Sequence, residues 1–349
     1  MSIRMIDIAV IGGGPAGLVA GLYAARGGAR TVIFERQAAG GQIITTAWVE
    51  NYPAFPEGVS GVDLGERMAA QATEQGAEMA LFSEVTSLTR VEAGDDLLPA
   101  LACAKSAASD VPPVAEAAQA AGEAPVAPRG GGFLLQTTDA PVFARAVILA
   151  TGAVPRKLGI VGEAAYTGRG VSWCATCDGA FYRDKVVAVI GGGDAALEEA
   201  LFLTKFASRV FLVHRRHEFR AAQAIVEKLA QSDKVEPVLG FIPLEILGGE
   251  DGKVCGLRLE QVEDGAERVL DVAGVFEFVG TDPIAELVAG GLIDTDARGY
   301  VRTDALGATD LAGLFAAGDV TDGQLKQVVT AAGAGANAAY AALHYLEGR

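Results

Sequence analysis

Two glycine-rich turns, each lying between a β-rich run and an Ala-rich helical run, predict an α/β fold of two Rossmann-like three-layer domains. The chain has 349 residues, and since a domain typically has roughly 150 residues, two domains are expected. Half of the residues are hydrophobic and 21% are charged, a balance that excludes a globally disordered chain.

The charge balance excludes several classes of partner. Lys and Arg number 28 against 44 Asp and Glu, so the net charge is −16 and the chain repels nucleic acids and anionic membranes. Two stretches, 8–25 and 327–346, carry no formal charge, but Gly12 to Pro15 interrupt the first and the second fits a buried Ala-rich helix. We therefore expect a soluble, cytoplasmic protein without a nucleic-acid or membrane partner.

The first glycine set is Gly12-x-Gly14-x-x-Gly17. It follows a predicted strand at 6–11 and opens a helix, so its backbone N–H groups can bind a pyrophosphate. A second strand at 31–34 is closed by Glu35, where a carboxylate accepts hydrogen bonds from ribose hydroxyls and disfavours a 2′-phosphate.

The second set, Gly191-x-Gly193-x-x-Ala196, repeats this order with a strand at 186–190, a helix at 194–207 and a strand at 210–213. Arg215 lies 24 residues after Gly191, within one residue of the offset of 23 that separates Glu35 from Gly12, and Arg216 and Arg220 follow. Guanidinium groups there favour a 2′-phosphate and hence NADPH. Two sites of opposite ribose preference predict one tightly held dinucleotide, FAD, and one exchanging NADPH.

The order of the strands predicts that the second domain is inserted in the first. Strands at 146–150 and 313–317 and the last helix fit the first domain better than the second. We predict an FAD-binding domain of residues 1–154 and 282–349 and an NADPH-binding and redox-disulfide domain of residues 155–281. An Ala/Pro/Gly-rich insertion at about 92–132 contains Cys103, to which we assign no role.

Cys174 and Cys177 are two residues apart and can close a small disulfide ring whose thiolate form is a nucleophile. Asp178 follows directly and can donate or accept a proton. Half of a zinc site is one alternative, but the other cysteines and the histidines form no second short-spaced pair, so no metal site is predicted. Two buried structural thiols without redox function are another alternative.

Several segments together resemble the low-molecular-weight thioredoxin reductases, homodimeric FAD enzymes of the pyridine nucleotide–disulfide oxidoreductase superfamily. The resemblance covers nearly the whole chain except about 92–132. It is carried by IGGGPAG at 11–17, GGQI at 40–43, ENYP at 50–53, ATGA at 150–153, CATCDG at 174–179, GGGDAALEEA at 191–200, HRRHEFR at 214–220 and AAGDV at 316–320.

The resemblance implies a role for each matching residue. Cys177 is the thiol that lies against the flavin, Cys174 the thiol that attacks the protein disulfide, and Asp178 the acid–base residue. Residues that would line the FAD site are Gly12, Gly14, Gly17, Glu35, Gly41, Gln42, Asn51 and Asp319, with Gln327 and Val328 near the flavin ring. Those that would hold NADPH are Gly191, Gly193, Asp194, Arg215, Arg216 and Arg220.

The implied activity is that of an NADPH-dependent thioredoxin-disulfide reductase. NADPH would reduce FAD, FAD would reduce the Cys174–Cys177 disulfide, and Cys174 would reduce thioredoxin after the inserted domain rotates. Arg169 and Phe181 are the candidate docking residues for thioredoxin, and a homodimer is expected. Alternatives are a reductase of another protein disulfide, such as a peroxiredoxin-type partner, and a flavin-bound redox sensor; a ferredoxin–NADP reductase is disfavoured because it lacks the Cys pair.

Overall fold

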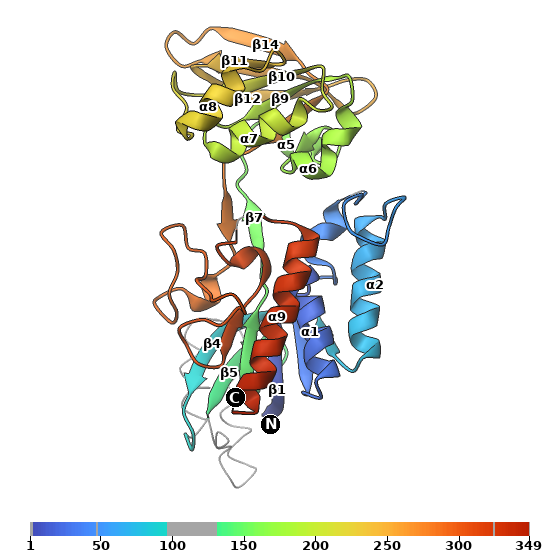
Figure 1. The fold of residues 1–349 in the computed structure, drawn as a ribbon, viewed down its shortest axis with the longest axis vertical. Coiled ribbons are helices and arrows are strands. Elements are labelled where there is room, and N and C mark those ends of the chain that lie inside the picture. The colour runs from blue at the N-terminus through green and yellow to red at the C-terminus, as the bar shows by residue number, and fades with distance from the viewer. Residues whose placement is uncertain (1–2, 47, 96–130, 324, 349) are drawn as a thin grey trace. The chain divides into compact units, whose positions relative to one another are not determined.

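A computed structural model describes residues 3–46, 48–95, 131–323 and 325–348 (Figure 1). The chain divides into two compact units: Met1–Val154 with Asp282–Arg349, called here the first unit, and Pro155–Thr281, the second unit. Cys103 and most of the predicted insertion lie outside the described residues.

The first unit is built on a seven-stranded sheet with strand order β3-β2-β1-β6-β5-β4, in which β17 also pairs with β6. The strands β1, β2, β3, β6 and β17 are parallel, and β4 and β5 are antiparallel to their neighbours. Their bounds are β1 Arg4–Ile11, β2 Thr31–Glu35, β3 Glu78–Leu81, β4 Val85–Val91, β5 Gly132–Thr137, β6 Val142–Leu149 and β17 Leu314–Ala316.

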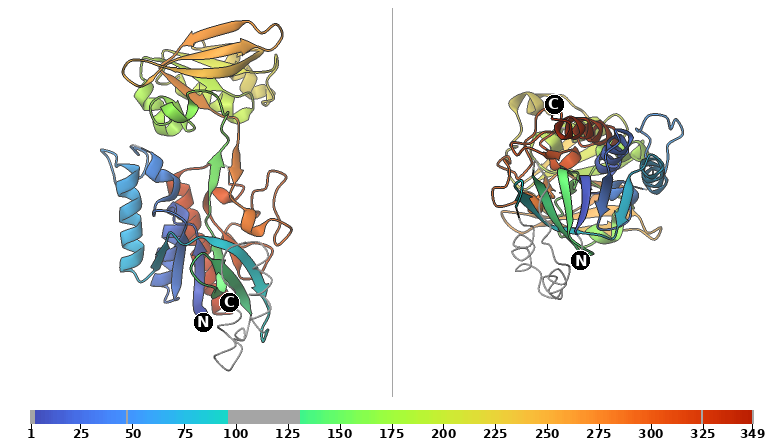
Figure 2. Two further views of the ribbon diagram at one scale, coloured as in Figure 1. Left: turned by 180° about the vertical axis from the view of Figure 1, so that it is seen from behind. Right: turned by 90° about the horizontal axis from the view of Figure 1, so that it is seen from below.

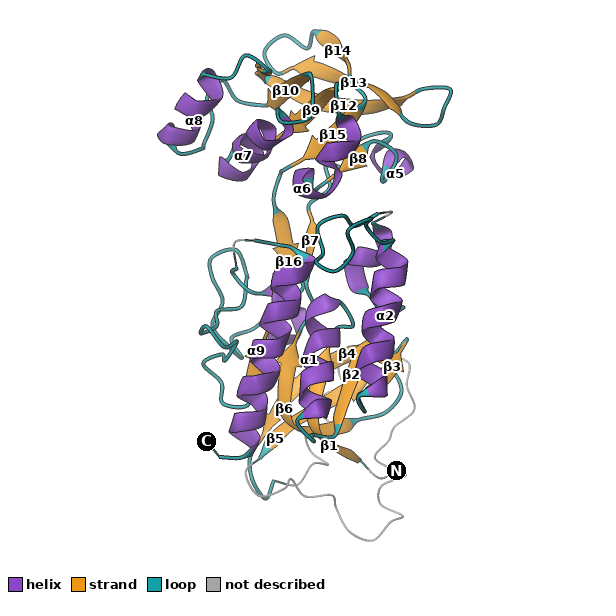
Figure 3. Ribbon diagram, turned by 45° about the vertical axis from the view of Figure 1, so that its right-hand side comes forward, coloured by secondary structure: helices purple, strands orange, loops and turns teal. Residues whose placement is uncertain are grey.

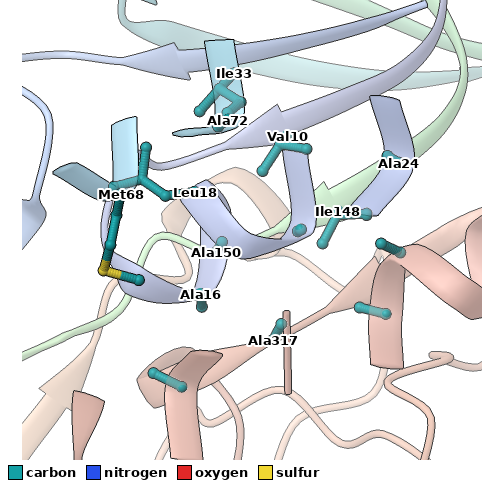
Figure 4. Packing of buried hydrophobic residues seen from close by; sticks show 14 of the residues in the cluster. Val10, Ala16, Leu18, Ala24, Ile33, Met68, Ala72, Ile148, Ala150 and Ala317 are labelled. Atoms are coloured by element: carbon teal, nitrogen blue, oxygen red, sulfur yellow. The ribbon is translucent and has the colours of Figure 1, made fainter. Parts of the chain in front are cut away.

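Three helices lie side by side on one face of this sheet: α1 (Pro15–Arg26), α2 (Gly61–Glu74) and α9 (Val328–Leu346) (Figure 3). Since successive residues of a strand point to opposite faces, Val10 and Ile148 pack under the helices (Figure 4), while Ile11 packs on the other face against Val288 and Val301. The Ala-rich last helix packs so closely on α1 that a Cβ on Gly335 would overlap with the carbonyl oxygen of Ala16. The described part of the unit also contains the 3₁₀ turns η1 (Gly41–Thr45), η5 (Glu286–Val288) and η6 (Gly318–Val320).

The second unit has three layers (Figure 2). Its central parallel sheet has the order β11-β10-β9-β15-β8, and an antiparallel sheet β12-β13-β14 packs on one face while helices pack on the other. The strands are β8 Val171–Ser172, β9 Val186–Ile190, β10 Arg209–His214, β11 Val235–Leu239, β12 Phe241–Gly248, β13 Val254–Gln261, β14 Glu267–Asp271 and β15 Gly274–Glu277. The helices are α5 Glu163–Tyr166, α6 Ala175–Asp178, α7 Asp194–Leu203 and α8 Gln223–Ala230, with the 3₁₀ turn η4 Gly179–Tyr182.

The chain passes between the units at two short paired strands, β7 (Ala153–Pro155) and β16 (Thr281–Pro283). The predicted α/β fold with two dinucleotide-type domains is confirmed. The helix expected at 194–207 is shorter and ends at Leu203, because the Phe206 and Ala207 N–H groups both turn back to the Leu203 carbonyl before β10 begins. Within the described ranges, no helix combines the length and hydropathy that a membrane span requires.

Candidate functional site

The first glycine turn joins β1 to α1 and leaves a helix N-terminus open to a ligand. Gly12 has φ +111°, and a Cβ on Gly17 would overlap with the Gly12 carbonyl oxygen, so both positions require glycine. The N-cap of α1, Gly14, supplies no side-chain hydrogen bond, and the nearest atom to a Cβ built on it is the Gly41 Cα at 3.9 Å. This open space next to unpaired backbone N–H groups fits a pyrophosphate.

Glu35 lies at the end of β2, where it binds the glycine turn and lines a cavity. Its Oε2 accepts the Gly13 N–H at 2.7 Å and its Oε1 accepts the Gln37 N–H at 2.8 Å. A carboxylate has about four acceptor positions, so each oxygen can still accept a hydroxyl. The cavity, of about 400 Å³, is also lined by Gly12 and Thr151 at the carboxyl ends of the parallel strands. That place and that lining fit the adenosine half of a dinucleotide.

Five further predicted FAD residues lie in the first unit, and the structure brings two of them together. The Asn51 side-chain amide donates to Gln327 Oε1 at 2.9 Å across 276 positions of sequence. Gln327 is also the N-cap of α9, which begins at Val328. The Gln42 side chain instead donates to the Ala153 carbonyl, and so it holds the segment after β6.

Asp319 lies in η6, which contacts α9. Burial raises the pKa of its carboxyl above the usual range, and the positive charge of Lys326 opposes that rise. The Lys326 ammonium donates to the carbonyls of Asp319 and Thr321 at 2.8 and 2.9 Å. Lys326 therefore anchors the η6 segment.

The second glycine turn joins β9 to α7 in the same way. A Cβ on Gly193, the N-cap of α7, would meet no atom within 4 Å, and this N-cap supplies no side-chain bond. Asp194 Oδ1 accepts the Ala222 N–H at 2.6 Å, so this predicted residue fastens the loop that carries the arginines. The Arg220 N–H donates to the Gly192 carbonyl at 2.7 Å, which ties that loop to the glycine turn.

The three arginines expected to recognise a phosphate, Arg215, Arg216 and Arg220, are exposed after the end of β10. No ion pair joins them to an acidic side chain in the part of the chain that the structure describes. Burial lowers the pKa of the neighbouring His214, and the charges of all three arginines lower it further. The loop thus carries an unneutralised positive field, which suits a phosphate.

Cys174 and Cys177 form a disulfide at the start of α6, and their Cα atoms are 5.3 Å apart. Cys174 is the N-cap of α6, and its Sγ accepts the Cys177 N–H at 3.2 Å and lies 3.3 Å from the Thr176 hydroxyl. Hydrogen bonds of this kind favour the charged form of a thiol. Cys174 is therefore the better placed of the two to act as a thiolate.

Asp178 ends α6, and its N–H donates to the Cys174 carbonyl at 3.1 Å. Burial raises the pKa of its carboxyl, while a hydrogen bond from Ser172 opposes the rise. Burial and the Asp178 charge raise the pKa of Tyr182 to about 12. A carboxyl with a raised pKa, on the residue directly after Cys177, is suited to proton transfer.

The sequence analysis missed the residues that hold the redox segment. Ser172 Oγ accepts the Cys174 N–H at 3.1 Å, and the Trp173 indole N–H donates to Glu277 at 3.1 Å. A serine two residues before a cysteine is a weak signal, and Glu277 lies on another strand, so only the fold reveals both. Among the described residues, His, Cys, Asp and Glu side chains form no group of three or more that could hold a metal ion.

Comparison with known proteins gives consistent results across sequence and structure. The family described as pyridine nucleotide-disulphide oxidoreductase matches residues 6–335. A thioredoxin reductase of Mycolicibacterium smegmatis is 41% identical over 341 residues, which cover 97% of this chain and 96% of the relative. One of Listeria monocytogenes is 38% identical over 346 residues, covering 99% of this chain and 95% of the relative.

Solved structures agree with this result. The crystal structure of thioredoxin reductase from Streptococcus pyogenes is 37% identical, covers 100% of both chains and has a TM-score of 0.82. That of thioredoxin reductase from Giardia duodenalis is 34% identical, covers 99% of both chains and has a TM-score of 0.80.

Proposed function

The chain belongs to the pyridine nucleotide-disulphide oxidoreductase family, and from that premise we propose that it acts as a thioredoxin reductase. It is an NADPH-dependent disulfide oxidoreductase whose redox group is the Cys174–Cys177 disulfide. The observation that carries the proposal is the pair itself, in which Cys174 Sγ accepts the Cys177 N–H at the start of α6. Two sulfurs that are bonded to each other are neither free structural thiols nor thiolate ligands of a zinc ion.

We assign FAD to the first unit and NADPH to the second. The open space at Gly14, the cavity at Glu35 and the Asn51–Gln327 bond support FAD. The open space at Gly193 and the unneutralised arginine loop support NADPH. Bound FAD supplies the two-electron carrier between NADPH and the disulfide. The assigned FAD residues are Gly12, Gly14, Gly17, Glu35, Gly41, Gln42, Asn51, Asp319, Gln327 and Val328, and the NADPH residues are Gly191, Gly193, Asp194, Arg215, Arg216 and Arg220.

The reduced pair then acts on the protein substrate by thiol–disulfide exchange. The Cys174 thiolate attacks one sulfur of the thioredoxin disulfide, forming a mixed disulfide and releasing the other sulfur as a thiolate. The Cys177 thiolate attacks Cys174 Sγ, which re-forms the Cys174–Cys177 disulfide and releases the second thioredoxin thiolate. Burial raises the pKa of Asp178, which favours proton transfer between its carboxyl and the chain's own thiols when the pair is reduced.

The pair must meet the flavin in one step and thioredoxin in another. We propose that the second unit rotates about β7 and β16, the two strands by which the chain crosses between the units. Arg169 and Phe181, the latter 46% exposed, are the proposed docking residues for thioredoxin. A homodimer is proposed as well, and sedimentation at micromolar concentration tests it, since a monomer alone would exclude it.

An absorption spectrum of the purified protein during NADPH titration tests the whole scheme. The flavin band should bleach with NADPH and return when oxidised thioredoxin is added. Cys174→Ser should still bleach but should not recover with thioredoxin, because the attacking thiol is missing. If the flavin band of the unaltered protein bleaches but does not return with thioredoxin, another disulfide protein is the substrate or the chain is a sensor. No bleaching with NADPH would exclude the assigned cofactors.

A further inference from the structure

Two buried glutamates in the second unit form a pair that the scheme above does not use. Glu163 begins α5 and is 3% exposed, and Glu277 ends β15 and is 2% exposed. Glu163 Oε2 accepts the Gly159 N–H at 2.6 Å, and Glu277 Oε2 accepts the Trp173 indole N–H at 3.1 Å. Each carboxyl therefore has one oxygen fixed by an N–H donor.

The other oxygen of each glutamate, Oε1, is buried without an N–H or O–H donor from any described residue. Glu163 raises the pKa of Glu277 both by its charge and as a hydrogen-bond partner, so the two carboxyls lie within reach of each other. Two carboxylates are both acceptors, so a hydrogen bond between them needs a proton on one of them. Burying two adjacent charges would be far more costly than burying one, and the pair is therefore expected to hold one shared proton.

Few charges act on Glu277 inside the unit. Glu163 faces it from α5, and Lys157, from the segment before α5, favours the charged form. The flanking strands β8 and β9 carry no titratable side chain. On β13, which also packs against β15, Arg258 is bound by glutamates of β12 and β14. Burial and Glu163 outweigh Lys157 and raise the pKa of Glu277 to about 8.

The pair is joined to the redox segment through one side chain. The parallel register of β15 with β8, in which Phe276 lies opposite Ser172, places Glu277 beside Trp173. Trp173 and Cys174 are the two residues that connect β8 to α6. The indole bond to Glu277 thus fixes the residue directly before the attacking cysteine, while Ser172 holds the Cys174 N–H.

On the premise of the proposed function, we propose that Glu277 is a positioning residue: its neutral carboxyl, shared with Glu163, holds the Trp173 indole and so keeps Cys174 placed for attack. When the shared proton leaves, repulsion between the two carboxylates outweighs the preference of the indole N–H for a charged Glu277, and Glu277 turns away because the Gly159 N–H holds Glu163. The Trp173 anchor is then weakened. Activity falls with it although no group that touches the substrate has changed.

The indole N–H of Trp173 reports this proton directly. The chain has two tryptophans, so labelling the holoenzyme with indole-¹⁵N tryptophan gives two N–H signals, and Trp48→Phe identifies that of Trp173. The Trp173 signal should shift with a midpoint near pH 8. Glu277→Gln keeps a hydrogen-bond acceptor but cannot titrate. In this variant the Trp173 signal should be that of a hydrogen-bonded indole N–H and should not change with pH. Glu163→Gln should lower the midpoint by about one pH unit or more, because a repelling charge is gone.

A matched control distinguishes the proton of Glu277 from that of Asp178, the carboxyl directly after Cys177. Asp178→Asn should leave the midpoint of the Trp173 signal in place. A wild-type signal that stays flat between pH 6 and 9.5, roughly the range that brackets the transition, overturns the proposal. A midpoint of the Trp173 signal that is still present in Glu277→Gln also overturns the proposal.

The kinetic readout is the turnover number against pH, measured with thioredoxin and with a small aromatic disulfide. It should decline above about pH 8 in the wild type and stay level in Glu277→Gln, with the KM for thioredoxin nearly unchanged. An equal decline in Glu277→Gln refutes the positioning role. If thioredoxin is not reduced at any pH while the small disulfide shows the predicted profile, the proposed function is wrong and the positioning role stands.

Discussion

The arginine loop after β10 allows a quantitative test of the assigned cofactor. Arg215 and Arg216 are exposed, have no acidic partner among the described residues and already act on His214 through their charge. A hydrogen bond to a charged group contributes about 1.5–3 kcal/mol, and exposure places these two at the lower end. Since about 1.4 kcal/mol corresponds to a tenfold change, each Arg→Ala substitution should weaken NADP⁺ roughly tenfold and the double substitution up to about 100-fold.

Calorimetric titration of the oxidised holoenzyme with NADP⁺ and NAD⁺ measures the effect. NAD⁺ has no 2′-phosphate, so its affinity should change by less than about threefold. The matched control is Arg209→Ala: Arg209 begins the same strand at its other end and pairs with Glu236 at 3.6 Å. It should leave both affinities unaltered. Equal weakening of NADP⁺ and NAD⁺ by Arg215→Ala and Arg216→Ala would show that these residues do not read the phosphate.

Three further outcomes are expected. Gly17→Ala should remove flavin from the purified protein, measured as flavin absorbance per chain, because the added Cβ overlaps with the Gly12 carbonyl oxygen; Gly333→Ala, at an exposed position of α9 where the Cβ meets no atom within 4 Å, is the control and should retain flavin. Asp178→Asn should slow reduction of the Cys174–Cys177 pair in stopped-flow measurements while NADPH binding is kept, and an unaltered rate would remove Asp178 from the proton path. The free energy of unfolding should fall between about pH 4.5 and 8, because folded Glu277 keeps a proton that the unfolded chain has released, by up to about 1.4 kcal/mol per pH unit; Glu277→Gln should flatten this decline in urea titrations, and an identical slope in both proteins would contradict the raised pKa.

Sequence patterns of short range predicted much of this molecule. The glycine turns at Gly12 and Gly191 were recognisable because a strand, a tight turn and a helix N-terminus must follow one another within a few residues. The Cys174–Cys177 disulfide was predictable for the same reason, since its ring closes locally. The return of the chain to the first sheet was visible in the strand that became β17, which pairs with β6.

Element ends were predicted less well. The strand expected from Ala146 begins at Val142, because pairing with β1 and β5, and not its own composition, extends it. In the same way α7 ends at Leu203, where backbone bonds of a following turn compete with the helix. The local propensity of a segment carries no information on the distant strand or turn that sets where a strand or helix ends.

What the amino-acid sequence by itself determined is the kind of chemistry: two dinucleotide turns, opposite charges at their ribose positions, and a pair of cysteines close enough to bond. The tertiary structure decided which distant groups act on those residues. Only the tertiary structure forms the hydrogen bonds from Asn51 to Gln327, from Lys326 to the Asp319 carbonyl and from the Trp173 indole to Glu277. The physical reason is that glycine turns and vicinal thiols act through a few neighbouring atoms of one segment, whereas burial and pKa depend on which strands and helices pack together.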